Sequence, residues 1–230
     1  MVNWQEFWDK KSEKNDFESM GRSSSSFKEL FIYIDSICRA LGDISKNDVI
    51  LDLGGGKGYI SMALSPFVEY TVLIDFSNKM VERAISETSS FKNIDVFQDS
   101  LPKLKNVRGK SLIFTKIIVG SVLQYLDNYD EIKTSFYNLY NVLEDGGKLF
   151  ITHNPDLSKK ESFLNSYNKL DWTKEKIAAA IEFEENERFW IDYNILEKEA
   201  KSVGFSKCLS LEIPSLLFQS THMFDLLLIK

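Results

Sequence analysis

The stretch from Val49 to Gly58 constrains this chain more than any other part of it. Its sequence, VILDLGGGKG, is an apolar run with one acid, typical of a buried strand, and it ends in glycines at alternate positions. A segment compatible with a helix, residues 59–64, follows directly. Because glycine lacks a Cβ and adopts positive φ, a ligand can approach the backbone closely at such a turn and meet the amino end of the helix. The pattern predicts a nucleotide-type site at the end of a strand.

The spacing of the glycines distinguishes between kinds of nucleotide loop. A dinucleotide-binding loop needs a third glycine where Tyr59 stands, and a phosphate-binding P-loop needs a hydroxyl residue after Lys57. The pattern that remains is D-x-G-x-G-x-G, formed by Asp52, Gly54, Gly56 and Gly58. It resembles motif I of the class I, Rossmann-like S-adenosylmethionine-dependent methyltransferases. The alternative is a glycine-rich turn without a ligand.

The resemblance implies a cofactor, S-adenosylmethionine, and a product, S-adenosylhomocysteine. In this family the loop wraps the methionine part of the cofactor, which is a zwitterion. An acid before the glycines accepts a hydrogen bond from the amino group of the cofactor, directly or through water. By this match the first cofactor-binding residues are Asp52, Gly54, Gly55, Gly56 and Gly58.

Two further acids follow the next two strand-like runs. Asp75 ends the run 69–75, about 20 residues after the glycine loop, where a carboxylate can accept both ribose hydroxyls. Phe76 and Met80 open the next helix, in an order similar to that of the family. The alternative for Asp75 is a helix cap or a strand-end acid.

Asp99 follows the run 94–98. In the family, an Asp at this place commonly accepts a hydrogen bond from the adenine amino group. The resemblance therefore makes Asp99 an adenine contact, with Ser100 and Leu101 beside the ring. On its own, Asp99 could equally be a turn residue.

Alternating strand-like and helix-like segments from residue 49 to residue 153 indicate an open parallel sheet. The fourth strand-like run is 111–120, and a tight turn at 144–147 precedes the fifth, 148–153. Residues 154–190 break this alternation, and a helix at 192–203 and strands at 205–213 and 223–229 follow. We expect an α/β fold: a Rossmann-like seven-stranded sheet, mostly parallel with the last strand antiparallel, and helices on both faces. An N-terminal helical arm and an insertion after strand 5 complete it. The family usually has an Asp near the start of the fourth strand, where Thr115 or Lys116 stands here.

We expect one domain over residues 1–230. Its parts are an arm and helix (1–45), a cofactor-binding core (46–153), a substrate-cap insertion (154–190) and a C-terminal helix with a strand pair (191–230). The aromatic residues of the arm, such as Trp4 and Trp8, predict packing against the domain surface. The alternative is a lid over the active site, with Met20-Gly21-Arg22 near the cofactor. Residues 23–26, all Ser, can cap the next helix. That helix is predicted up to Gly42 by an apolar stripe at helical spacing, formed by Phe27, Leu30, Phe31, Ile34, Ile37, Cys38 and Leu41.

Composition narrows the class of partner. The net charge is −6, so the whole chain shows no electrostatic footprint for nucleic acid. No signal peptide or membrane span is apparent, which favours a cytoplasmic protein without membrane partners. The two cysteines and two histidines are far apart in sequence, so no metal site is expected. The oligomeric state does not follow from the sequence.

The chemistry of methyl transfer needs alignment, and for an alcohol acceptor also a general base. The best candidate is His153, at the carboxyl end of the fifth strand, where open α/β sheets place their ligands. The alternative is a histidine that only shapes the pocket. Residues 120–126 resemble the segment of the family that runs along the cofactor towards the acceptor, which makes Gln124 and Tyr125 candidates on the substrate side. Tyr125 is a second candidate for the base, and Asp156 and His222 are weaker ones.

The predicted function is methylation of a small-molecule acceptor, on oxygen of a metabolite or of a sugar-linked compound. Part of the resemblance, the aromatic arm and the insertion, is to small-molecule methyltransferases, including some found with surface-glycan biosynthesis genes. Two alternatives stay open. One is a nucleic-acid or protein methyltransferase, and the other is a non-catalytic S-adenosylmethionine-binding protein.

Overall fold

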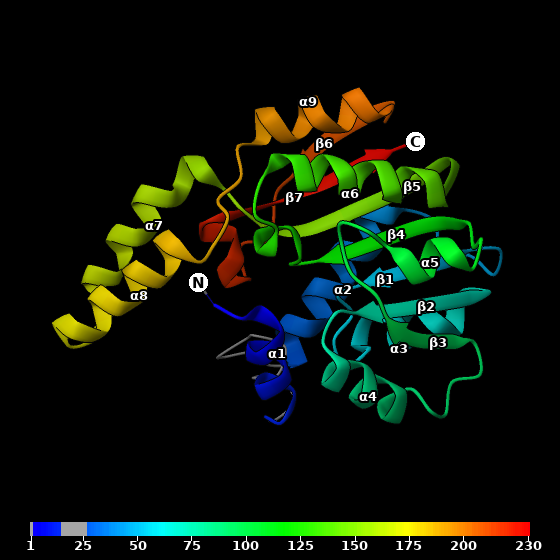
Figure 1. Ribbon diagram of the computed structural model, residues 1–230, viewed down its shortest axis with the longest axis horizontal. Coiled ribbons are helices and arrows are strands. Elements are labelled where there is room, and N and C mark those ends of the chain that lie inside the picture. Colours follow the sequence, from blue (N-terminus) through cyan, green and yellow to red (C-terminus); the bar gives the residue numbers. More distant parts are fainter. Residues whose placement is uncertain (1, 15–26) are drawn as a thin grey trace.

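A seven-stranded sheet runs through the centre of the molecule (Figure 1). The computed structural model describes residues 2–14 and 27–230. The stretches 20–22 and 23–26 named above lie outside the described residues. The strand order is β3-β2-β1-β4-β5-β7-β6. The strands are β1 Val49–Leu53, β2 Tyr70–Asp75, β3 Ile94–Gln98, β4 Phe114–Gly120, β5 Leu143–Pro155, β6 Lys207–Leu211 and β7 Met223–Ile229.

Strand direction matches the sequence expectation. The strands β3, β2, β1, β4 and β5 pair in parallel with their neighbours. Only β7 runs the other way, antiparallel to both β5 and β6. Because parallel strands need crossover connections, helices separate most of them along the chain. The predicted α/β, Rossmann-like fold with an antiparallel last strand is confirmed.

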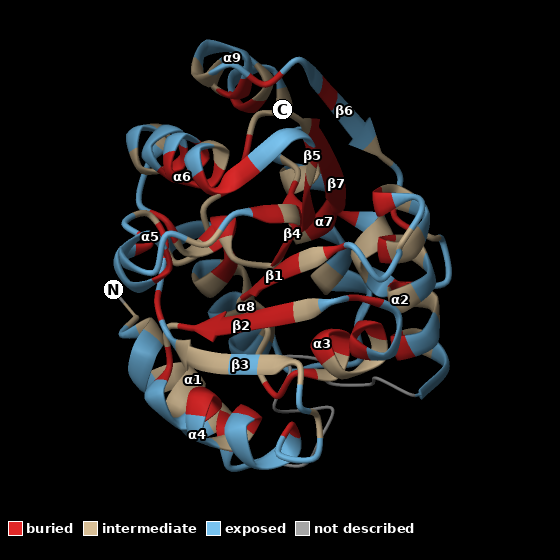
Figure 2. Cartoon of the chain, turned by 90° about the vertical axis from the view of Figure 1, so that its right-hand side faces the viewer, coloured by how far each residue is buried: buried red, intermediate tan, exposed pale blue. Residues whose placement is uncertain are grey.

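Helices cover both faces of the sheet. They are α1 Trp4–Ser12, α2 Phe27–Leu41, α3 Tyr59–Leu64, α4 Asn78–Glu87, α5 Lys105–Gly109, α6 Tyr129–Val142, α7 Lys160–Ser166, α8 Lys174–Asn186 and α9 Tyr193–Val203. Buried side chains of α5, α6 and α9 pack on one face, and those of α2 and α3 pack on the other. Figure 2 shows the buried strands between exposed helix surfaces.

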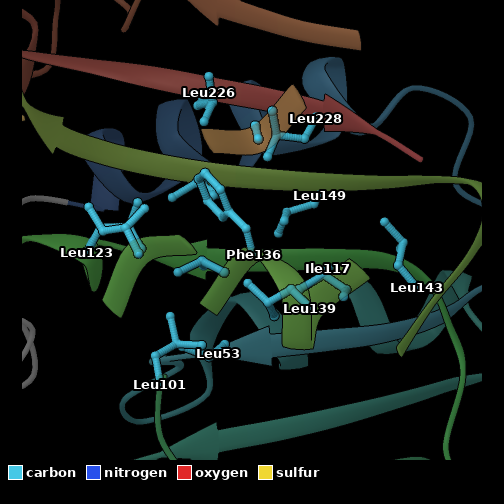
Figure 3. Close-up of a cluster of buried hydrophobic side chains, with 14 of the residues drawn as sticks. Leu53, Leu101, Ile117, Leu123, Phe136, Leu139, Leu143, Leu149, Leu226 and Leu228 are labelled. Carbon is cyan, nitrogen blue, oxygen red and sulfur yellow. The ribbon is translucent and has the colours of Figure 1, made fainter. Parts of the chain in front are cut away.

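Successive residues of the central strands serve the two faces in turn. In β4, Ile117 and Val119 join the cluster beneath α5, α6 and α9, while Ile118 joins the cluster beneath α2 and α3. This follows from the two-residue period of a strand, and it explains why β4 is apolar at consecutive positions. Figure 3 shows the larger cluster, in which Phe136 and Leu139 of α6 lie near Ile117 and Leu149 of the sheet.

Element ends differ slightly from the expected ones. β4 begins at Phe114 rather than near Ser111, because Ser111 has a left-handed backbone with φ +54° that cannot continue a strand. β5 begins at Leu143 and includes the expected turn, where Gly146 has φ +79°.

The N-terminal arm and the insertion meet at the carboxyl edge of the sheet. In Figure 1, α1 and the pair α7–α8 lie on the same side of the molecule. The ring of Trp4 in α1 packs on Phe183 of α8 with ring centroids 5.9 Å apart, and the N–H of Val2 donates to Glu187. Segments that are far apart in the sequence, by 185 residues at the contact of Val2 with Glu187, are thus brought together. Within the described residues no helix has both the length and the apolar character that a membrane span needs.

Candidate active site

A cavity of about 290 Å³ opens at the carboxyl ends of β1, β2, β3 and β4. This is the edge at which open α/β sheets bind their ligands. The wall is formed by the glycine loop, the acids after β2 and β3, the segment after β4, and helices α1, α2 and α3. The lining residues are Trp4, Trp8, Leu30, Tyr33, Asp52, Leu53, Gly54, Gly55, Gly56, Tyr59, Ile60, Asp75, Phe76, Met80, Asp99, Ser100, Leu101, Gly120, Ser121, Val122, Tyr125 and Leu126.

The glycines of the loop have different roles. A Cβ on Gly54, which has φ +73°, would lie 2.5 Å from Cγ2 of Val122, so this position admits only glycine. At Gly56, with φ +54°, a Cβ would meet no atom within 4 Å. Gly58 does not line the cavity. A Cβ there would meet Thr88 at 2.9 Å, so this glycine serves the packing at the start of α3.

Asp52 is buried beside the loop at the end of β1. Its Oδ2 accepts a hydrogen bond from the hydroxyl of Ser61 in α3 at 2.7 Å. Burial raises the pKa of Asp52 to about 6, although the hydrogen bonds from Ser61 act in the opposite direction. The carboxyl group therefore joins β1 to α3 and also borders the cavity.

Asp75 presents its carboxylate across the same loop. Oδ2 accepts from the N–H of Gly56 at 3.1 Å, and Oδ1 accepts from the N–H of Ser77 at 2.9 Å. Burial raises the pKa of Asp75 to about 6. A carboxylate has about four acceptor positions, so this group retains capacity to accept from a ligand.

The other predicted cofactor residues also reach the cavity, namely Phe76, Met80, Asp99, Ser100 and Leu101. The carboxylate of Asp99 is engaged with the backbone. Oδ2 accepts from the N–H groups of Asn106 and Val107 at 2.9 and 2.8 Å, and Oδ1 accepts from Ser100 at 2.9 Å. Asp99 thus holds the start of α5, the kind of turn role that the sequence had left open.

Aromatic side chains form the opposite wall. Tyr125 lies against Trp4 and Trp8, with ring centroids 4.6 and 6.1 Å apart. Burial raises the pKa of Tyr125 to about 12, so its hydroxyl remains protonated at neutral pH and is able to donate a hydrogen bond. The two tryptophans reach the site because α1 is tied to α4. Asp9 accepts from the hydroxyl of Ser77, and the guanidinium of Arg83 donates to the carbonyl of Ser12 at 3.0 Å.

His153 does not line the cavity. Its side chain is 2% exposed and lies behind two lining residues. Nδ1 is 3.3 Å from Oγ of Ser121, and the ring stacks on Tyr33 with centroids 4.7 Å apart. The weaker candidate His222 does not line the cavity either. Its ring stacks on that of Phe163, a residue of the insertion, with centroids 3.8 Å apart. Burial lowers its pKa to about 3.

The sequence prediction named neither Leu30 and Tyr33 of α2 nor Tyr59 and Ser121 as site residues. The apolar stripe of α2 indicated a buried face but could not show that this face borders the cavity. Ser121 lies in the segment after β4 that was expected on the acceptor side. Within the described residues, no group of three metal-ligating side chains is close enough to hold a metal ion.

Comparison with known proteins identifies the family. Residues 44–202 match the model of a family described as "Methyltransferase domain". The chain belongs to this family of methyltransferase domains. This confirms the class I, S-adenosylmethionine-dependent family expected from Asp52 and the glycine loop.

Two individual relatives match only part of the chain, at 30% identity. The chain is 30% identical over 146 residues to the ubiquinone/menaquinone biosynthesis C-methyltransferase UbiE of Wigglesworthia glossinidia brevipalpis, covering 60% of this chain and 52% of that protein. It is also 30% identical over 110 residues to the malonyl-[acyl-carrier protein] O-methyltransferase of Halalkalibacterium halodurans, covering 46% of this chain and 40% of that protein. The methyltransferase domain thus spans about half the length of these relatives or less.

A solved structure confirms the fold. The N-methyltransferase NodS from Bradyrhizobium japonicum, in complex with S-adenosylhomocysteine, superposes with a TM-score of 0.65 and 14% identity. The alignment covers 100% of this chain and 99% of NodS.

Proposed function

We propose that this methyltransferase transfers the methyl group of S-adenosylmethionine to a small molecule, on oxygen of a metabolite or of a sugar-linked compound. The observation that carries the proposal is the form of the cavity. The glycine loop and Asp75 lie on one side, and the aromatic rings of Trp4, Trp8 and Tyr125 lie on the other. An acceptor that reaches the same cavity beneath α1 has to be small.

The residues present fit the cofactor. The carboxylate of Asp75 retains acceptor capacity beyond its bonds to the backbone, which suits ribose hydroxyls, and the space beside Gly56 is open for close approach. Asp52 supplies a carboxylate for the amino group of the methionine part. We assign the adenine to Phe76, Met80, Ser100 and Leu101. Asp99 is included through its Oδ1, which accepts a hydrogen bond from the N–H of Ser100 and has a further lone pair.

When bound, S-adenosylmethionine supplies a methyl group on a positively charged sulfur. The protein's contribution is to hold acceptor and donor in line, and such positioning supplies about 7–11 kcal/mol in favourable cases. Trp4, Trp8 and Tyr125 exclude water from the acceptor side. A dry cavity favours a reaction in which charge is dispersed.

Methylation on oxygen is supported by the polar groups of the acceptor side. Hydroxyl-bearing Tyr33 and Ser121 line the cavity there and can hydrogen-bond a hydroxyl acceptor. The relatives include enzymes named for transfer to carbon, oxygen and nitrogen, so their names favour no single acceptor atom.

The test is a titration followed by an acceptor screen. We expect S-adenosylmethionine and S-adenosylhomocysteine to bind in a calorimeter and NAD not to bind. In the screen, formation of S-adenosylhomocysteine with phenols, sugars, carboxylic acids and amines identifies the acceptor class. Methylation of tRNA or of a protein, with no small molecule methylated, would overturn the proposal. Cofactor binding without turnover on any acceptor would favour the non-catalytic alternative.

A further inference from the structure

Two neighbouring residues at the edge of the cavity share an unusual backbone conformation. Ser121 follows β4 and His153 lies in β5, and both have φ of +58°. Residues other than glycine are disfavoured in this conformation, because their Cβ approaches the backbone carbonyl. Such strain persists only where the surrounding structure imposes it, and it clusters at functional sites. The N–H of Ser121 donates to the carbonyl of Thr152, which places the two residues side by side.

A β-bulge imposes the conformation of His153. Ile151 pairs with Leu226 and Asn154 pairs with Phe224, so Thr152 and His153 together lie opposite the single residue Asp225. The N–H of His153 therefore loses its place in the ladder. It donates instead to Oδ1 of Asp225 at 2.7 Å, within the buried core. Bulges of this kind turn a side chain towards a new direction and are frequent beside active sites.

The imidazole turned in this way lies directly behind the cavity wall. Its Nδ1 is 3.3 Å from Oγ of Ser121, and its ring stacks on Tyr33, whose hydroxyl is 2.7 Å from Oγ1 of Thr152. Ser121 and Tyr33 line the cavity, whereas His153 does not. A group in the cavity thus meets the serine hydroxyl first and the imidazole behind it.

We propose that Ser121 contacts the acceptor hydroxyl and that His153 takes up the acceptor's proton through it. The acceptor O–H proton moves to Oγ of Ser121 as the Ser121 hydroxyl proton moves to Nδ1 of His153, in the tautomer with its proton on Nε2. The acceptor oxygen forms the new C–O bond as the S–CH₃ bond breaks with its electron pair on sulfur. The products are the methyl ether, the neutral thioether and an imidazolium. After the product leaves, the imidazolium returns its proton through the hydroxyl of Ser121 to water in the cavity.

The inference rests on the proposed function, and it makes Ser121 the catalytic residue and His153 a positioning and proton-accepting residue. Other groups of the cavity are poorly suited as the base. Asp52 and Asp75 are held by Ser61 and by the glycine loop, and Tyr125 is protonated. Asp225 acts on His153 by holding its backbone.

The first experiment uses the acidity of the acceptor. Wild type, Ser121→Ala and His153→Asn are compared on the best hydroxyl acceptor of the screen and on para-substituted phenols, from para-cresol to para-nitrophenol. Asn tolerates a left-handed backbone, so this variant retains the local conformation. For the weakly acidic acceptors we expect kcat/KM to fall about 100-fold or more. For para-nitrophenol, which is largely ionised at mildly alkaline pH, the decrease in kcat/KM should be about tenfold at most.

The second experiment measures strain independently of activity. Ser121→Gly removes both the hydroxyl and the cost of its backbone conformation, so we expect a higher melting temperature together with the same loss of activity as Ser121→Ala. Ser111→Gly is the matched control. Ser111 has a similar backbone conformation, with φ +54°, but is exposed and is not one of the residues that line the cavity. This variant should gain stability and keep full activity.

The outcomes separate the inference from the proposed function. Equal losses on every phenol, or full activity in Ser121→Ala, would overturn the proton transfer while the methyltransferase function stands. If wild type binds S-adenosylhomocysteine but methylates no hydroxyl compound, O-methylation fails and the inference fails with it. A larger loss on weakly acidic acceptors, with Ser121→Gly more stable, supports it.

Discussion

Asp75 is the residue on which we expect cofactor binding to depend most. Its oxygens accept from Gly56 and Ser77, and Asn at this position would place an NH₂ group against one of those N–H donors. Because a hydrogen bond to a charged group contributes about 1.5–3 kcal/mol, we expect Asp75→Asn to weaken S-adenosylhomocysteine binding about 100-fold. Calorimetric titration measures it. Asp95→Asn, an exposed change on neighbouring β3, is the control and should bind as wild type does.

The raised pKa values of Asp52 and Asp75 predict a dependence of binding on pH. Burial raises both to about 6, so in the free protein these carboxyls become protonated as the pH falls through that value. A protonated carboxyl loses acceptor capacity, and the affinity for the cofactor should decrease below a pH of about 6. Titrations across this range test it, and an affinity that rises in acid would contradict it.

The same pKa values make the stability of the free protein change with pH in the direction opposite to that of its affinity for the cofactor. Each carboxyl binds its proton more tightly in the folded state than in the unfolded state, where its pKa is near 3.8. Between about pH 4 and 6 this contribution therefore makes the free protein more stable as the pH falls. The stabilisation that the cofactor adds should shrink over the same interval. Thermal melts with and without S-adenosylhomocysteine separate the two effects.

At this scale the sequence predicted positions better than contacts. Asp52, Asp75 and Asp99 all border the cavity, as the strand-end pattern indicated. The pattern could not show that Asp99 has its carboxylate engaged by residues 106 and 107, because that depends on how the chain returns through α5. Nor could it show the bulge at His153, which arises from pairing with a strand about 70 residues away.

Among the elements, α1 is held over the cavity by a few polar contacts. Asp9 accepts from Ser77, next to Asp75, and Glu13 pairs with Lys79. Removing one net hydrogen bond costs about 0.5–1.5 kcal/mol, so Asp9→Ala should weaken cofactor binding by up to about tenfold. Stopped-flow tryptophan fluorescence should show faster release. Gln5→Ala, an exposed change on the same helix, is the control, and equal release rates in both variants would contradict the role of α1.

The end of α8 depends on a buried ion pair. Glu184 is 6% exposed, and Nε of Arg188 lies 2.8 Å from its carboxylate. Replacing Arg188 with Met leaves this charge unpaired, and we expect the free energy of unfolding to fall by about 3 kcal/mol at neutral pH. Burial already raises the pKa of Glu184, and losing Arg188 raises it further, so the deficit should shrink in mild acid.

Urea denaturation at neutral pH and at about pH 5 tests this prediction. Arg188→Lys retains a positive charge and serves as the matched control, with a smaller loss. A deficit in Arg188→Met that is the same at both pH values would show that lost packing, rather than the unpaired charge, is the cause.

Element types followed from the sequence where periodicity was strong. The stripe of α2 and the consecutive apolar residues of β4 gave a helix and a central strand. The tertiary position of α1 did not follow, since Trp4 and Trp8 could pack on any apolar surface. Their contact with Tyr125 joins residues more than a hundred positions apart, and no local pattern specifies such a contact.

Over the whole molecule, three parts of the chain that lie far apart in the sequence meet around the site. The sheet and its two apolar clusters fix the carboxyl ends of β1, β2 and β4. The arm covers that edge through Trp4, and the insertion reaches the arm through Phe183. Loss of packing in the arm or the insertion should therefore affect ligand binding while the sheet remains folded.

Cofactor binding should stabilise the molecule as a whole, because it links several strand ends at once. A ligand at 100 times its Kd stabilises the folded state by about 2.7 kcal/mol. For a chain of this size that corresponds to a rise in melting temperature of about 5–10 °C. Differential scanning fluorimetry with S-adenosylhomocysteine tests it. At the same ligand concentration Asp75→Asn, with its weaker binding, should shift by only about 1 °C, and NAD should give no shift. A shift with NAD alone would mean that the loop of Gly54 and Gly56 holds a dinucleotide, and the assignment of the cofactor would then be wrong.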